Sequence, residues 1–407
     1  MQQYDILICG GGLVGASLAL ALKPLDLKVA LLEAAPFGSA EQPSFDERTT
    51  AISNGAQRIF QAIGVWPLIQ RAATPIKRIH VSDRGRFGFA RIDAQEQGLA
   101  QLGHVVVNRI MGEALWRRLR EERIDVHAPA KVVGLDMGGE QRVVRVELNG
   151  AEQSFAARLV IAADGAQSAV RQAAGIDAQT RDYAQTAVIA NLATQKFHDH
   201  VAYERFTSDG AIAMLPLPDA RVGLVWVLPR ELAAEALKFD DAQFLARLQS
   251  EFGLRLGRFT QIGKRFAYPL ALTQASQHTA ERLAIIGNAA QSLHPIAGQG
   301  FNLGLRDAAS LAEALADERA ASAAFDPGAT QVLQRYAAWR GEDRQGIVQF
   351  TDGLVKLFTN KFGPIKAARN VGMLLFDLSP HAKDYLARLS LGAAGKIPRL
   401  ARGATLL

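Results

Sequence analysis

Tyr4-Asp-Ile-Leu-Ile-Cys-Gly-Gly-Gly-Leu-Val-Gly15 is the stretch of this 407-residue chain that decides the fold. Its first six residues predict a buried strand, and an apolar helix follows to about Leu22. Residues 28–32 predict a second strand, which ends at Glu33. The stretch therefore predicts a strand–helix–strand unit of the kind that builds parallel sheets.

The glycines of this unit form a G-x-G-x-x-G pattern, and each has its own physical role. Gly10 makes the turn after the strand, Gly12 lets a pyrophosphate reach the helix N-terminus, and Gly15 lets helix and strand pack closely. Glu33 follows 23 residues after Gly10, where it can accept hydrogen bonds from a ribose. Strand, helix, strand and acid in register predict a dinucleotide site.

A second stretch, His294-Pro-Ile-Ala-Gly-Gln-Gly-Phe-Asn-Leu-Gly-Leu-Arg-Asp307, predicts a loop followed by a helix over residues 303–316. Pro295 stiffens the entrance, while Gly298 and Gly300 let a planar ligand approach the backbone. The positive end of the helix dipole would face a ligand that becomes negatively charged. The alternative is a tight loop that only caps a helix.

Three polar residues lie at junctions between predicted elements. A buried strand over 159–163 runs into Asp164 and Gly165, and Ser168 can cap the short helix that follows. Ligands of open α/β sheets bind at such carboxyl ends of strands, although turn formation is the alternative role of Asp164. Arg48 and Arg109 lie before helices, where a surface charge or an ion pair is as reasonable as a ligand contact.

Composition limits the function classes. Apolar residues make up 49% of the chain and charged residues 21%, as in ordinary globular enzymes. Cys9 is the single cysteine, so no internal disulfide is expected and a reducing compartment is favoured. Neither a signal peptide nor a run of about 20 apolar residues is present, so we expect a cytoplasmic protein without a membrane span. No nucleic-acid motif is found, and we predict no nucleic-acid partner and no metal site.

The pattern of elements predicts an α/β fold with a discontinuous Rossmann-like domain. Strands alternating with turns over residues 181–274, together with 75–98, predict an inserted, mostly antiparallel β-sheet lobe that walls a substrate site. The dinucleotide domain is then predicted to comprise residues 1–74, 99–180 and 275–345.

The C-terminal region, residues 346–407, is predicted to be helical over 347–358, 367–375 and 383–391. Past Gly353 the chain carries nine lysines and arginines against two aspartates, a balance of +7, so the rest of the chain is nearly neutral. A packed helical tail is one interpretation. A basic amphipathic segment that attaches peripherally to the inner face of the plasma membrane is the other.

The motifs together resemble the flavoprotein aromatic hydroxylases related to para-hydroxybenzoate hydroxylase, over about residues 1–345. Within them, the 294–307 stretch is similar to the ubiquinone-biosynthesis hydroxylases. The sequence from Gly287 to Pro295 resembles the branch that acts on 2-polyprenyl-6-methoxyphenols and oxidises ring carbon 1 in ubiquinone numbering. The wider class usually has Asp and His where this chain has Asn288 and Gln291. That departure is typical of the ubiquinone branch.

The resemblance implies FAD as cofactor, with NADPH or NADH as a transient reductant. Glu33 would hold the adenosine ribose, Arg48 and Arg109 the ribityl-phosphate side, and Asn288 the ribityl chain. The full set of residues predicted to bind the cofactor is Gly10, Gly12, Val14, Gly15, Glu33, Arg48, Arg109, Asp164, Gly165, Gly287, Asn288, Gly298, Gln299, Gly300, Phe301 and Asn302.

The activity implied is hydroxylation of a polyprenylated phenol through a flavin C4a-hydroperoxide, giving 2-polyprenyl-6-methoxy-1,4-benzoquinol. The resemblance also implies a ubiquinone-biosynthesis complex as partner. His294 and Pro295 are the candidate catalytic residues, because His294 is the nearest titratable group, although it could equally buttress the loop. Two alternatives stay open: a related hydroxylase acting at another ring position or on a soluble aromatic acid, and a non-catalytic prenyl-binding escort protein.

Overall fold

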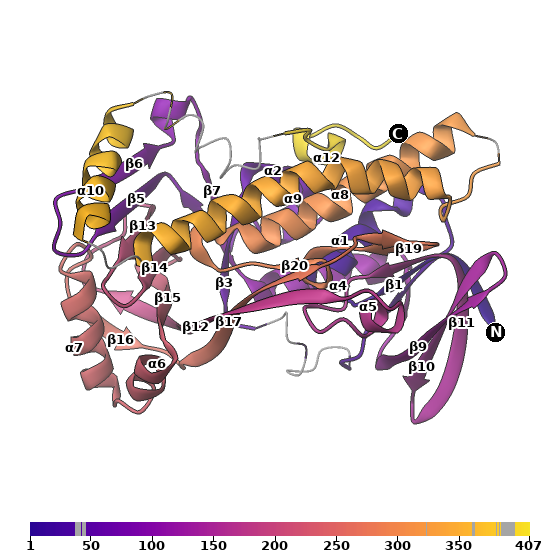
Figure 1. Ribbon diagram of the computed structural model, residues 1–407, viewed down its shortest axis with the longest axis horizontal. Coiled ribbons are helices and arrows are strands. Elements are labelled where there is room, and N and C mark those ends of the chain that lie inside the picture. The colour runs from indigo at the N-terminus through magenta and orange to yellow at the C-terminus, as the bar shows by residue number, and fades with distance from the viewer. Residues whose placement is uncertain are drawn as a thin grey trace.

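The computed structural model of the protein (Figure 1) describes residues 1–36, 42, 46–322, 324–359, 363–379, 381, 383 and 395–407. Two large sheets lie toward opposite ends of the long axis, and two long helices, α8 (Gln299–Ala321) and α9 (Thr330–Thr359), run along that axis. The predicted α/β class with an inserted, mostly antiparallel lobe and a helical C-terminal region is confirmed.

The first sheet contains the strand–helix–strand unit. Its strands lie in the order β18-β19-β11-β1-β2-β8, and the five from β19 to β8 are parallel. A hairpin, β9–β10, extends β11 on its antiparallel side. The bounds are β1 (Gln2–Cys9), β2 (Val29–Leu32), β8 (Asp125–His127), β9 (Ala130–Gly138), β10 (Gln141–Leu148), β11 (Ala151–Ala162), β18 (Thr279–Ala280) and β19 (Leu283–Ile285).

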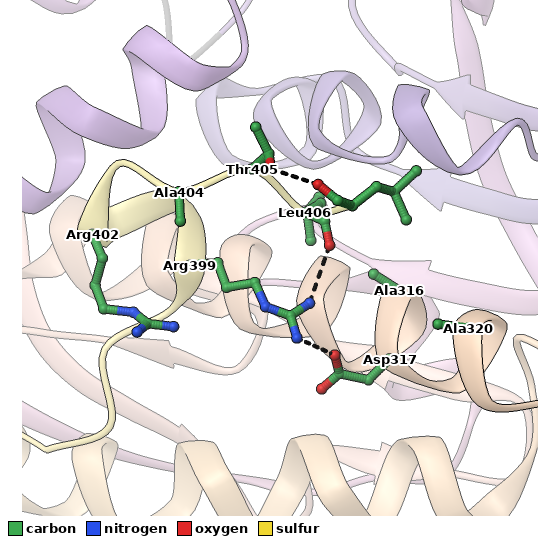
Figure 2. A pocket seen from close by; sticks show the side chains of 9 residues that line it. Ala316, Asp317, Ala320, Arg399, Arg402, Ala404, Thr405 and Leu406 are labelled. Atoms are coloured by element: carbon green, nitrogen blue, oxygen red, sulfur yellow. Dashed lines mark hydrogen bonds and ion pairs between the residues drawn. The ribbon is translucent and has the colours of Figure 1, made fainter.

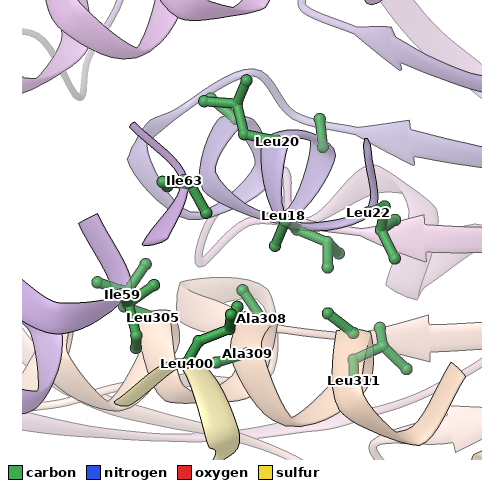
Figure 3. Packing of buried hydrophobic residues seen from close by; sticks show 14 of the residues in the cluster. Leu18, Leu20, Leu22, Ile59, Ile63, Leu305, Ala308, Ala309, Leu311 and Leu400 are labelled. Atoms are coloured by element: carbon green, nitrogen blue, oxygen red, sulfur yellow. The ribbon is translucent and has the colours of Figure 1, made fainter. Parts of the chain in front are cut away.

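Helices cover this sheet and bury its largest core. Leu18 of α1 (Leu13–Ala21), Ile59 of α2 (Asn54–Ala62) and Leu311 of α8 meet in it (Figure 3). α8 begins at Gln299, four residues before the predicted start, because Gly298 adopts φ +60° and turns the chain into the helix. The remaining helices near this sheet are α3 (Trp66–Ile69), α4 (Asn108–Glu121) and α5 (Ala169–Ala173).

The second sheet is the lobe, with the order β20-β17-β12-β15-β14-β13-β5-β6 and β16 paired to β12. Its pairs are antiparallel except β13–β5, which is parallel. Two helices, α6 (Arg230–Ala236) and α7 (Asp241–Phe252), pack on its outer face. The strands are β5 (Arg78–Asp83), β6 (Phe89–Asp93), β12 (Ala178–Thr194), β13 (Val201–Phe206), β14 (Ala211–Pro216), β15 (Arg221–Pro229), β16 (Phe259–Ile262), β17 (Phe266–Ala275) and β20 (Gln291–Ser292).

A small sheet, β3-β7-β4, joins the two larger ones. Its strands are β3 (Thr49–Ser53), β4 (Thr74–Ile76) and β7 (Gly103–Val107). Three predicted boundaries fall inside elements: 74/75 lies in β4, 180/181 in β12 and 345/346 in α9. The chain therefore passes between its parts within continuous strands and a continuous helix.

The C-terminal region returns to the body of the protein. α10 (Gly363–Leu378) packs against β6 of the lobe, and α12 (Arg399–Arg402) packs beside α2 and α8. Arg399 forms an ion pair with Asp317 of α8 at 2.6 Å and donates to the carbonyl of Leu406 (Figure 2). Most of the predicted helix over 383–391 lies outside the described residues. Among the helices described, none is long and apolar enough to cross a bilayer.

Candidate active site

The turn between β1 and α1 is built for a close approach of backbone to ligand. Gly10 adopts φ +114°, and a Cβ there would lie 2.4 Å from the carbonyl oxygen of Ala163, so only glycine fits. Gly12 occupies the N-cap of α1, and no described side chain caps the helix. The first N–H groups and the dipole of α1 therefore remain directed at this turn, as a pyrophosphate requires.

Glu33 lies beside this turn, directly after β2, and is 6% exposed. One carboxylate oxygen accepts the N–H of Gly11 at 2.7 Å and the other accepts that of Ala35 at 2.8 Å. Each oxygen has a second lone pair, so the carboxylate can hold the turn and still accept from ribose hydroxyls. This geometry fits the adenosine end of a dinucleotide.

The second glycine-rich stretch lies against the first. A Cβ at Gly287, which adopts φ +61°, would lie 3.3 Å from the Val14 side chain, and one at Gly304 would lie 3.0 Å from it. Val14 thus packs between two glycines, and this contact brings α8 beside the start of α1. The N-termini of α1 and α8 both lack a described side-chain cap, so their first N–H groups are available to a ligand.

Asn302 fixes the start of α8. Its Oδ1 accepts the N–H of Ser53 at 2.8 Å, and its Nδ2 donates to the carbonyls of Ala51 and Gly298, each at 2.9 Å. Apart from its chain neighbours and the backbone of its own helix, no described protein atom lies within 4 Å of the position that a Cβ would take at Gly300. The loop is therefore held rigidly from behind while its glycine face stays accessible to a planar group.

Asp307 ties the turn at Gly287 to α8 and α9, and it is fully buried. Its carboxylate accepts the N–H of Gly287 at 3.1 Å and the side chain of Gln291 at 3.2 Å, and it forms ion pairs with Arg340 at 2.8 Å and Arg344 at 3.1 Å. Burial raises the pKa of Asp307, but the two guanidinium groups outweigh it and hold that pKa below its usual value.

Of the other polar residues predicted to bind the cofactor, three interact with protein side chains and the fourth is exposed to solvent. The carboxylate of Asp164 accepts the hydroxyl of Ser168 at 2.5 Å, and burial raises its pKa. Arg109 pairs with Glu47 and Glu113, at 2.7 and 2.9 Å, and Arg48 pairs with Asp46 at 2.6 Å. Asn288 is exposed. For all four, contact with a cofactor stays a prediction.

A cavity of 570 Å³ opens beside the glycine loop. Its lining is almost wholly apolar, and Glu204 and Arg369 are its charged members within the described part of the chain. The lining residues come from β3, β7 and the 296–302 loop on one side, the lobe strands on another, and α9 and α10 on the third: Ala51, Ile52, Ser53, Ile76, Ile79, Val81, Ala90, Ile92, Leu102, Gly103, Glu204, Phe206, Ile296, Gln299, Asn302, Phe350, Leu354, Leu357, Phe358, Ala368, Arg369, Gly372, Met373 and Phe376.

The C-terminal helices are thus a wall of this cavity, clamped to the lobe. Arg369 of α10 forms a buried ion pair with Asp83 of β5 and donates to the carbonyls of Leu357 and Phe358. The rings of Phe358 and Phe206 stack with their centroids 3.4 Å apart. The guanidinium of Arg369 is therefore engaged with the wall itself.

His294 lies behind the loop, 1% exposed, and is not among the residues that line the cavity. Its Nδ1 accepts the N–H of Ile296 at 3.3 Å, so the proton of the neutral ring sits on Nε2, which donates to Gln185 Oε1 at 3.3 Å. Burial lowers the pKa of His294 to about 4. These contacts favour the buttressing role over the catalytic one, and catalysis by His294 or Pro295 stays a prediction.

Comparison with known proteins supports a dinucleotide site at the two glycine-rich stretches. A family model described as "FAD binding domain" matches residues 3–351. The "Ubiquinone hydroxylase UbiL" of Rhodospirillum rubrum is 36% identical, with 99% of this chain and 93% of that protein covered. The "3-demethoxyubiquinol 3-hydroxylase" of Escherichia coli is 32% identical over 96% of this chain and 99% of that protein. This chain belongs to the family of FAD-dependent monooxygenases.

A solved structure supports the same fold. The p-nitrophenol 4-monooxygenase PnpA from Pseudomonas putida superposes with a TM-score of 0.79, covering 97% of this chain and 100% of that one at 18% identity. Both the predicted cofactor, FAD, and the predicted class of enzyme are confirmed, and reduction by NAD(P)H is typical of the family.

The residues at the two glycine-rich stretches are of a kind that fits FAD. Glu33 would hold the adenosine ribose, the N-terminus of α1 would hold the pyrophosphate, and residues 298–302 would lie against the ring. When bound, FAD supplies electron transfer from NAD(P)H and activation of O₂. The protein would then stabilise negative charge at the N-terminus of α8 and exclude water through the apolar walls of the cavity.

Sequence reasoning missed three features of the monooxygenase. Asp307 was quoted as the end of a motif, yet its arginine partners lie more than 30 residues away and no local pattern shows them. The C-terminal helices were assigned to a tail. Glu204 was passed over, although a signal was present: it shares strand parity with Ala202 and Phe206 and so lies on the apolar face of β13.

Proposed function

We propose that this monooxygenase hydroxylates the aromatic ring of a polyprenylated phenol in ubiquinone biosynthesis. The observation that carries the proposal is the apolar cavity, which extends from the glycine loop to the space between α9 and α10. A phenol head placed at the loop would leave its prenyl chain among side chains such as Leu354, Met373 and Phe376. The names of the relatives support the same pathway.

The charge pattern of the cavity argues against a soluble aromatic acid as substrate. A carboxylate substrate needs an unengaged cation or several donors in an apolar site. Arg369 is the cation that lines the cavity among the described residues, and it is engaged by Asp83 and two carbonyls. A neutral phenol fits this wall better than an anion.

The ring position is the finer part of the proposal. On the basis of the sequence from Gly287 to Pro295, we propose that oxygen enters 2-polyprenyl-6-methoxyphenol at the carbon para to its hydroxyl, which is ring carbon 1 in ubiquinone numbering. The product is then 2-polyprenyl-6-methoxy-1,4-benzoquinol. To test it, the FAD-loaded enzyme is given NADPH, O₂ and, in turn, a farnesylated phenol, its 6-methoxy derivative and a demethoxyubiquinol. The products are identified by mass spectrometry and NMR. Oxygen at another ring carbon would overturn the position, and no turnover of any prenylated ring would overturn the function.

A pair of variants tests the cavity itself. Met373→Gln places an amide in the apolar wall and should weaken binding of the farnesylated phenol about tenfold, since an unpaired buried amide costs about 1–3 kcal/mol. Val371→Gln, two residues away, changes a side chain that is 50% exposed, and it serves as the control. Equal binding by both variants would contradict the assignment.

We further propose that α10 faces the membrane in which such a substrate resides. The inner side of α10 lines the cavity, whereas Val371, Leu375 and Leu378 on its outer side are 50%, 62% and 78% exposed. Phe87, 68% exposed, lies in the loop that hydrogen-bonds to α10 through Gly88, and Arg86 is exposed beside it. Apolar side chains beside basic ones suit the interface of an anionic bilayer.

Vesicle sedimentation tests this surface. Leu375→Asn with Leu378→Asn should reduce binding of the full chain to vesicles containing an anionic lipid. The control is Val133→Asn with Met137→Gln, which alters side chains 47% and 43% exposed on β9, toward the opposite end of the molecule from α10 (Figure 1). Equal sedimentation of both double variants and the parent protein would discard the proposal.

A further inference from the structure

Glu204 is a carboxylic acid placed in an apolar cavity. It lies in β13 opposite Val81 of β5 and Ala213 of β14, and its side chain lines the cavity together with Val81 and Phe206. Within the described part of the chain, no group donates a hydrogen bond or a positive charge to its carboxylate. It differs in this from Asp83, on the same wall, which is paired with Arg369.

Placing a carboxyl group in this cavity costs free energy, which distinguishes Glu204 from the apolar residues of the same wall. A carboxylate removed from water without a partner is destabilised, and here burial alone raises the pKa of Glu204 to about 7. An aliphatic residue or a glutamine would form the same strand without that penalty. A proton acceptor that titrates near neutral pH is suited to general base catalysis.

Other titratable groups near the cavity are already engaged. His294 lies outside the lining, with both ring nitrogens in hydrogen bonds. Tyr183 donates to Asp352 at 3.4 Å, and burial raises its pKa to about 12. Arg369 is held by Asp83, and β14 contributes no charged residue. Among the described residues, Glu204 is thus the acid that can meet a substrate hydroxyl in this cavity.

We propose that Glu204 is the catalytic base, whose carboxylate accepts the hydroxyl proton of the phenol substrate. The phenol O–H bond breaks, the proton moves to Glu204, and the electron pair left on oxygen makes the ring carbons more nucleophilic. The added oxygen atom comes from O₂ by the monooxygenase activity, and the other atom of O₂ leaves as water, with two electrons supplied by NAD(P)H. The hydroxylated carbon then loses its own proton to water as the phenol oxygen recovers one from Glu204. This inference rests on the proposed phenolic substrate.

The test compares binding of a farnesylated methoxyphenol with that of its methyl ether, which lacks the proton. Affinities are measured on the oxidised FAD-loaded enzyme by flavin fluorescence, without NAD(P)H, at pH values from 5.5 to 8.5. For the parent protein, the preference for the phenol should grow as the pH rises through about 7 and reach roughly tenfold to a hundredfold, since a hydrogen bond to a charged acceptor then forms.

Glu204→Gln should abolish the pH dependence of this preference and lower kcat about a hundredfold or more. Glu204→Asp, which keeps the carboxylate, should retain part of both. The exposed Glu231→Gln of α6 is the matched control and should leave the preference unchanged. A merely structural role would weaken binding of both ligands equally.

The outcomes separate this proposal from the proposed function. If the parent protein binds and hydroxylates the phenol, but Glu204→Gln keeps the same pH-dependent preference, Glu204 is not the base. If the parent protein neither binds nor hydroxylates any prenylated phenol, the proposed function fails first. Repeating the binding series with unprenylated phenol–ether pairs then decides whether Glu204 senses a hydroxyl in another substrate. A preference independent of pH for every pair would overturn the base.

Discussion

Asp307 is a fully buried carboxyl group and Glu204 is a half-buried one that lines the cavity, and their environments are opposite. Asp307 of α8 accepts from one backbone N–H, one amide and two arginines. Glu204, in the cavity wall, has apolar neighbours and no partner among the described residues. The pKa of Asp307 is accordingly lowered, and that of Glu204 is raised to about 7.

The difference shows how one chain uses buried charge for two purposes. At Asp307 the charge is fixed by its partners, and it holds α8, α9 and the Gly287 turn in one arrangement beside the predicted cofactor site. At Glu204 the charge is left without compensation, which weakens the fold but keeps a group able to exchange its proton. A buried carboxylate whose oxygens all have partners has a structural role, whereas a carboxyl group without partners in a cavity is a candidate for a chemical role.

The largest effect is expected for Asp307→Asn. It removes the described anion of the buried Arg344 and leaves the buried Arg340 with Asp343 alone, so it should lower the free energy of unfolding by about 3–5 kcal/mol. Urea denaturation with and without added FAD measures the loss. Asp317→Asn on the same helix is the control, because Asp317 is 33% exposed and its ion pair should contribute about 1 kcal/mol or less. Similar losses for both variants would mean that Asp307 is not the anchor.

Glu204→Gln should have the opposite sign. The folded protein holds the Glu204 proton up to about pH 7, whereas an unfolded glutamate loses it near 4.5, so stability falls as the pH rises through this window. The variant should therefore be more stable than the parent by about 1–3 kcal/mol at pH 8 and by less than about 1 kcal/mol at pH 5. Paired urea titrations at the two pH values measure it. A destabilised variant at pH 8 would show that Glu204 has a partner.

The smallest effect is expected for Gln291→Met, which removes the single hydrogen bond that the Gln291 amide donates to Asp307. The two arginines remain, so the loss should be about 1 kcal/mol, as for an ordinary hydrogen bond. Denaturation under the conditions used for Asp307→Asn gives the comparison. A loss as large as that of Asp307→Asn would mean that the amide, rather than the arginines, holds the carboxylate.

The candidate cofactor site was predictable from sequence because its residues lie close together in the chain. Gly10, Gly12 and Glu33 lie within one strand–helix–strand unit, where spacing alone fixes their geometry. The start of α8 was placed four residues late, since the apolar stripe begins at Leu303 but Gly298 starts the turn. The early start leaves Asn302 inside the first turn, where it reaches back to Ala51 and Ser53.

The cavity was not predictable in the same way because its walls come from distant segments. β5, β13 and α10 meet only after the whole chain has folded, and the pairing of Asp83 with Arg369 spans 286 residues. A helix with one basic and one apolar face looks like a surface tail until its partner is known. Local pattern indicated that α10 is amphipathic, and tertiary structure shows what its inner face covers.

The place of α9 and α10 at the end of the chain also orders events during synthesis. By the time Arg344 has left the ribosome, the residues predicted to bind the cofactor have all been made. The cavity still lacks the wall that Phe350 to Phe376 will provide. A nascent chain therefore makes the residues of its cofactor site before it can enclose a substrate.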